Sequence, residues 1–196
     1  MPAIANTPER FGLLTRALHW LMALGIVGML AFGTVLTRIE PSLSTIWMYG
    51  VHKSVGLVLL ALALGRIAWH RASPPPPPLG GVPAWQSRLA RATHRALYLL
   101  VVAVPLSGWI GSAASGLDVV AFGRWTLPRI APISEPWQDG AFLIHGVLTK
   151  LLAALIVLHI AGALKRRDGT LRRMVRGRAW PSENARTFRR GRSQNP

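Results

Sequence analysis

Four long apolar segments constrain the fold of this 196-residue chain more than any other feature. They cover about residues 17–37, 51–69, 94–113 and 141–164. A helix needs about 20 consecutive apolar residues to cross a bilayer, and only helices or closed barrels satisfy their backbone hydrogen bonds inside one. Hydrophobic residues make up 51% of the chain. We therefore expect an all-α fold, an integral membrane four-helix bundle.

The fourth segment carries two histidines fourteen residues apart, His145 and His159. This spacing is close to four helical turns, so both imidazoles share one helix face, about 21 Å apart along the axis. Histidine inside a membrane span is rare and is usually functional. Two histidines on one face, near the two sides of the bilayer, predict two stacked cofactors.

Basic residues distinguish the two sides of the membrane. The net charge is +16, and most of the 23 lysines and arginines precede the first segment, join the second to the third or follow the fourth. The positive-inside rule therefore places both termini in the cytoplasm. Topology and binding to anionic membrane lipid explain this charge better than nucleic acid, which we do not expect as a partner. The expected organisation is a cytoplasmic N-terminal segment (1–16), a four-span domain (17–164) and a basic cytoplasmic tail (165–196).

With this topology, four histidines form two layers by depth. His52 shares the outer layer with His145, and His19 shares the inner layer with His159. Two imidazoles can fill both axial positions of a haem iron, which suits one-electron transfer. The absence of cysteine excludes thiolate ligation and covalent haem attachment.

Other interpretations of the histidines remain at this stage. A single histidine at the end of a span is usually an interfacial polar residue, as we expect for His70. A zinc or copper site needs three or more ligands at one depth, and only the inner layer has a third candidate, His94. His94 has three possible roles: the environment of an inner haem, a quinone pocket or the membrane interface.

Several motifs carry a resemblance to a known family. They are ALHW at His19, YGVHKSVGLVLLALALGRIAW at His52, the PPPP linker, LARATHRALYLLVVAVPLSGW at His94, FGRWTLP, and HGVLTKLLAALIVLHIAGAL with the tail RDGTLRRM. Over about residues 9–178 the chain resembles the bacterial cytochrome b561 family of the four-span type. The resemblance implies two b haems in a multi-pass protein of the bacterial inner membrane. It implies the iron ligands His19 and His159 for the inner haem, and His52 and His145 for the outer haem.

The resemblance also implies an activity. A characterised activity in this family is the oxidation of superoxide at the periplasmic face, with ubiquinone reduced at the cytoplasmic side. The alternative is a membrane cytochrome b relay or anchor that passes electrons between a periplasmic redox partner or dehydrogenase and the quinone pool. A haem-free membrane scaffold is the third possibility.

Residues near the two layers are candidates for handling these substrates. Lys53, next to His52, is the candidate for steering superoxide toward the outer layer, and Arg38, Arg124 and Arg129 could assist. Alternatively, Lys53 neutralises a haem propionate, and the loop arginines are solvated or pair with Glu135 and Asp139. The candidates for a quinone site or the inner-haem environment are Arg16, Trp20, Arg91, His94 and Arg95.

Overall fold

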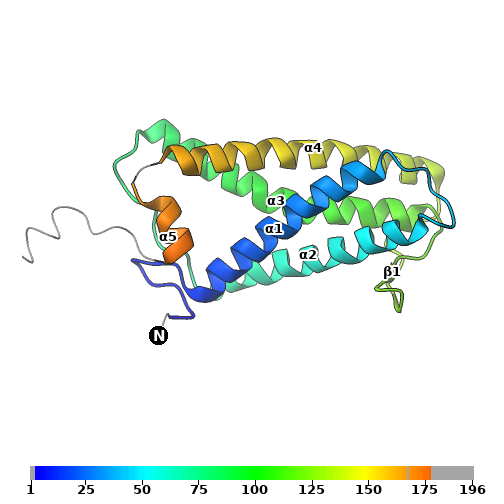
Figure 1. The fold of residues 1–196 in the computed structure, drawn as a ribbon, viewed down its shortest axis with the longest axis horizontal. Helices are drawn as coiled ribbons and strands as arrows, with labels where there is room; N and C mark the ends of the chain where they lie inside the picture. The colour runs from blue at the N-terminus through cyan, green and yellow to red at the C-terminus, as the bar shows by residue number, and fades with distance from the viewer. Residues whose placement is uncertain (1–2, 167, 178–196) are drawn as a thin grey trace, which may run out of the picture.

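The computed structural model describes residues 3–166 and 168–177, and most of the predicted basic tail lies outside these residues. Four long helices dominate it: α1 (Leu13–Leu36), α2 (Ile46–Ala72), α3 (Ala84–Ala114) and α4 (Glu135–Lys165). All four are long and apolar enough to cross a membrane. The expected four-helix membrane bundle is therefore confirmed (Figure 1).

The two ends of the bundle carry different segments (Figure 1). We call one the basic end: it holds residues 3–12, the connection 73–83 and the short helix α5 (Thr170–Arg176). The other, the hairpin end, holds the connections 37–45 and 115–134. The second of these contains strands β1 (Val120–Ala121) and β2 (Trp125–Thr126), which pair antiparallel. Both ends of the described chain thus lie at the basic end.

Each long helix packs against the next in sequence, and the contact between α3 and α4 is the most extensive. The proline-rich connection separates α2 from α3, because five consecutive prolines from Pro74 to Pro78 cannot continue a helix. Pro83 then stands directly before the first residue of α3, as expected for a proline at a helix start. Further along, α3 continues through Pro105. Contacts between consecutive helices thus join α1, α2, α3 and α4 into one bundle.

A buried arginine of α5 holds the basic end together. The guanidinium of Arg173, only 4% exposed, donates hydrogen bonds to the backbone oxygens of Pro8, Glu9 and Pro77 at 3.0, 3.0 and 2.8 Å. It also lies 5.5 Å from the centre of the Phe11 ring. Burial lowers the pKa of Arg173, and the nearby Glu9 carboxylate opposes this effect. One side chain therefore joins the N-terminal segment, the proline-rich connection and α5.

Candidate functional site

The first pair of histidines lies toward the basic end of the bundle. His19 is six residues after the start of α1 at Leu13, and His159 is six residues before the end of α4 at Lys165. Their ring centroids are 6.2 Å apart, with an angle of 62° between the ring planes. A third imidazole, that of His94 on α3, lies 5.2 Å from the His159 ring. Three helices thus contribute a histidine to this inner layer.

The second pair lies toward the hairpin end. His52 is six residues after the start of α2 at Ile46, and His145 is ten residues after the start of α4 at Glu135. Their ring centroids are 6.3 Å apart, with an angle of 74° between the ring planes. The two pairs predicted from depth are therefore the two pairs that the fold brings together. The α4 members are fourteen residues apart, a rise of about 21 Å.

Glycines give the outer pair the space that it occupies. A Cβ atom on Gly33 of α1 would lie 3.3 Å from Cε1 of His52. A Cβ atom on Gly108 of α3 would lie 3.1 Å from both Cε1 and Nδ1 of His145. Both distances are tighter than ordinary carbon contacts of about 3.5–4 Å. The missing side chain of Gly108 therefore leaves room beside α3 for the His145 ring.

Hydrogen bonding differs between the two outer imidazoles. Nδ1 of His145 donates to the backbone oxygen of Val104 at 2.9 Å, which directs its other nitrogen, Nε2, away from this partner. Nδ1 of His52 is buried and has no hydrogen-bond partner in the described part of the chain. An unsatisfied buried nitrogen is costly, by about 1–3 kcal/mol. The outer pair thus contains one buried imidazole nitrogen, Nδ1 of His52, that is free to form a further hydrogen bond.

The proposed quinone residues do not converge on one point. Trp20 packs edge-on against His19, with ring centroids 5.3 Å apart, and His94 lies beside His159. Arg16 instead faces α5: its guanidinium donates to the backbone oxygens of Met174, at 3.1 Å, and Val175. The remaining two candidates, Arg91 and Arg95, are exposed on α3. The inner layer therefore keeps Trp20 and His94 as its immediate aromatic neighbours.

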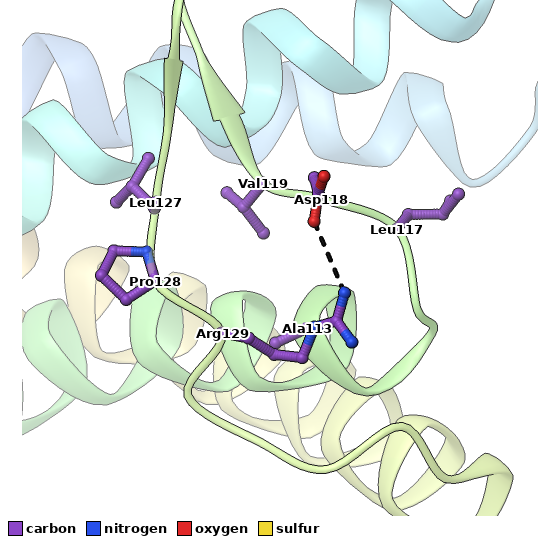
Figure 2. A pocket seen from close by; sticks show the side chains of 7 residues that line it. All are labelled: Ala113, Leu117, Asp118, Val119, Leu127, Pro128 and Arg129. Carbon is purple, nitrogen blue, oxygen red and sulfur yellow. Dashed lines mark hydrogen bonds and ion pairs between the residues drawn. The ribbon is translucent and has the colours of Figure 1, made fainter.

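At the hairpin end, the arginines of the loop have local partners. Arg129 pairs with Asp118 at 3.5 Å, rather than with Glu135 or Asp139 (Figure 2). This ion pair lies at a small hollow between the end of α3 and the strand segments, which no histidine lines. Arg124 lies 5.8 Å from the centre of the Trp125 ring. These contacts orient both side chains within the loop itself.

Lys53 is half-buried on α2, beside His52 in sequence. Across residues 3–166 and 168–177, no ion pair joins its ammonium group to a carboxylate. Lys150, further along α4 than His145, is exposed. Lys53 is thus the cation nearest in sequence to an outer histidine and has no acidic partner of its own.

A polar cluster at the basic end is not evident from the sequence. The sequence predicts a plain interfacial role for His70, but its Nδ1 lies 2.8 Å from the hydroxyl of Tyr98 on α3. The same hydroxyl accepts a hydrogen bond from Nε of Arg66 at 3.2 Å. The signal for this contact was the position of Arg66 inside the second apolar segment.

Comparison with known proteins agrees with the motifs. The model of the family described as prokaryotic cytochrome b561 matches residues 10–177. The chain is 36% identical over 180 residues to cytochrome b561 homolog 2 of Escherichia coli (strain K12), which covers 88% of this chain and 95% of that relative. It is 31% identical over 178 residues to cytochrome b561 homolog 1 of the same organism, covering 85% and 97%.

A third relative has a name that states an activity. The chain is 27% identical over 172 residues to the probable superoxide oxidase CybB of Yersinia pestis, covering 85% of this chain and 96% of that protein. The match spans nearly the whole of each relative, and the four apolar helices suit a multi-pass protein of the bacterial inner membrane. The chain belongs to the prokaryotic cytochrome b561 family, membrane proteins that transfer electrons with b-type haem.

Proposed function

We propose that this protein binds two b haems, oxidises superoxide at the hairpin end and reduces ubiquinone at the basic end. The observation that carries the proposal is the presence of two histidine pairs, one toward each end of a single membrane bundle. His19 and His159 would hold the inner haem, and His52 and His145 the outer haem. The hairpin end is then periplasmic and the basic end cytoplasmic.

The geometry of both pairs fits a haem. His19 with His159, and His52 with His145, would each hold one haem iron: their ring centroids lie 6.2 and 6.3 Å apart, and an imidazole nitrogen binds a transition-metal ion at about 2 Å. Gly33 and Gly108 keep the space beside the outer rings open, and the bond from His145 to Val104 orients one of them. A haem held by these histidines would supply one-electron transfer.

Two superoxide anions each lose one electron and leave as O₂, and one ubiquinone takes up the two electrons and two protons to become ubiquinol. Lys53 would attract the anionic donor toward the outer pair, because its charge has no acidic partner in the described chain. Trp20 and His94 lie beside the inner pair, where the quinone would approach.

The haem assignment is tested by absorption spectra and haem content. Purified protein should show b-type bands and two haems per chain. The variants His52→Ala and His145→Ala should each lose the same haem, while His19→Ala and His159→Ala should each lose the other. If His52→Ala and His159→Ala removed the same haem, the pairing would be wrong. Absence of b-type bands in the unaltered protein would reject the proposal as a whole.

The activity is tested in liposomes that contain the protein and ubiquinone. We expect superoxide to disappear faster than by spontaneous dismutation, with ubiquinol formed at one molecule per two superoxide anions. Lys53→Gln should slow the reaction at low ionic strength, and its effect should shrink in high salt because screening removes electrostatic steering. A protein that carries two haems but does not accelerate superoxide loss would instead support the relay or anchor function.

A further inference from the structure

Arg66 lies at the same level of the bundle as the inner histidine pair. It is six residues before the end of α2 at Ala72, just as His19 and His159 are six residues from the basic ends of their own helices. It contacts Tyr98 of α3, which is one helical turn from His94. The inner layer therefore receives one side chain from each of the four long helices, and the one from α2 is a cation.

Two aromatic side chains hold this cation in place. Nε of Arg66 donates to the hydroxyl of Tyr98 at 3.2 Å, and the guanidinium carbon lies 5.8 Å from the centre of the Tyr98 ring. Nδ1 of His70 lies 2.8 Å from the same hydroxyl. Because Nε is engaged by the tyrosine, the two terminal nitrogens of the guanidinium remain to bind another group.

Within residues 3–166 and 168–177, no carboxylate forms an ion pair with Arg66. The described residues form two ion pairs, Arg129 with Asp118 and Arg166 with Asp168, and neither includes it. Arg66 is nevertheless half-buried within a membrane-spanning helix. A charge in such a position usually pairs with another group or marks a functional site. The chemistry that satisfies a planar guanidinium best is a carboxylate, which can accept two parallel hydrogen bonds.

We infer that Arg66, positioned by Tyr98 and His70, binds a carboxylate of the haem held by His19 and His159. The inference rests on the proposed function, since that function supplies the inner haem. Arg66 would act as a positioning residue and as a counter-charge. Its positive charge favours the reduced state of the haem and therefore raises the reduction potential at this site alone.

The test is a potentiometric titration of both haems in the full-length protein, with the inner haem identified by its retention in His52→Ala. Arg66→Gln should lower the potential of the inner haem by an amount equal to roughly tenfold in the reduction equilibrium, ~59 mV for one electron. The outer haem should not change. Arg71→Gln is the matched control, because Arg71 is an exposed arginine on the same helix, and it should shift neither potential.

Two further variants separate charge from structure. Arg66→Lys should restore most of the inner potential, and Tyr98→Phe, which keeps the ring but removes the hydroxyl, should lower it by less than Arg66→Gln does. Unchanged reduction potentials in Arg66→Gln would overturn the inference. If Arg66→Gln does not accumulate, an unchanged potential of the inner haem in Tyr98→Phe would overturn it instead. So would unchanged potentials with a raised KM for ubiquinone, since Arg66 would then bind the quinone. A chain without two haems would instead defeat the proposed function.

Discussion

The single residue Gly108 determines how closely the His145 ring can approach α3. Its missing side chain lets the imidazole of His145 approach α3, where Nδ1 of that ring reaches the Val104 carbonyl. Gly108→Val would place two methyl groups in the same space, so we expect His145 to be displaced. The variant should retain about one haem of the two, as is also expected for His145→Ala, when haem content is measured after purification.

The control for this prediction is Gly146→Ala. Gly146 follows His145 directly on α4, but a Cβ atom there meets no other atom within 4 Å. This variant should keep both haems. If Gly108→Val also kept both with unaltered spectra, the close approach of α3 to His145 would have no part in holding the outer site.

At the scale of an element, α5 depends on Arg173 more than on its own seven residues, since so short a helix is marginal in isolation. Arg173→Ala would leave the oxygens of Pro8 and Pro77 without their donor. We expect local opening to become easier by about 3 kcal/mol, since hydrogen bonds to charged groups contribute about 1.5–3 kcal/mol each. Hydrogen exchange at the backbone amides of residues 6–12 and of Ser73, which precedes the prolines, should accelerate about a hundredfold.

Arg176→Ala is the comparison for Arg173→Ala, because Arg176 lies on the same helix but is exposed. Its exchange pattern should match that of the unaltered protein. Equal acceleration in both variants would mean that the charge of α5, rather than the buried contacts of Arg173, holds the basic end together.

Asp168 links the connection after α4 to α5 and makes this end sensitive to acid. Burial raises the pKa of its carboxyl, but hydrogen bonds from Arg166 and Thr170 outweigh this effect and hold the pKa below its usual value. A depressed pKa means that ionised Asp168 stabilises the folded state at neutral pH. This contribution is lost as the pH falls through the folded-state pKa.

The melting temperature of Asp168→Asn, followed by tryptophan fluorescence, should therefore lie below that of the unaltered protein at pH 7. The two should converge as the pH falls through the folded-state pKa of Asp168, because the unaltered carboxyl then also becomes protonated. Asp118→Asn should show a smaller difference throughout, because its ion pair with Arg129 is exposed. A gap for Asp168→Asn that stays constant with pH would contradict the role of its ionisation.

These elements also show what a sequence can predict here. The four spans could be predicted because length and apolar composition alone set the requirement for crossing a bilayer. The two histidine pairs could be predicted because helix direction alternates, so depth follows from position along the chain. The contacts of Arg173 could not be predicted. Its partners are backbone oxygens, such as that of Pro8, and every residue has a backbone oxygen, so the sequence does not mark them. The contact of His70 with Tyr98 depends on the rotation of two helices about their axes, which hydropathy leaves undetermined.

At the scale of the whole molecule, the two ends differ in charge. Arg71, Arg88 and Arg91 are among the basic residues at or near the basic end, where Glu9 and Asp168 are the acidic residues of the described chain. The hairpin end has a more even balance of charge. Its basic residues include Arg38, Arg124 and Arg129, and its acidic residues are Glu40, Asp118, Glu135 and Asp139. The positive-inside rule therefore predicts that the basic end faces the cytoplasm.

This orientation can be measured directly because the chain contains no cysteine. Leu43, 99% exposed at the hairpin end, and Gly80, exposed in the proline-rich connection, offer single sites for introduced cysteines. In intact spheroplasts, a membrane-impermeant maleimide should label Leu43→Cys, whereas Gly80→Cys should react only after the membrane is permeabilised. The reverse pattern would place Lys53 and the outer histidine pair on the cytoplasmic side. Superoxide generated outside the cell could then not reach the site proposed for it, because a charged anion crosses the apolar bilayer poorly.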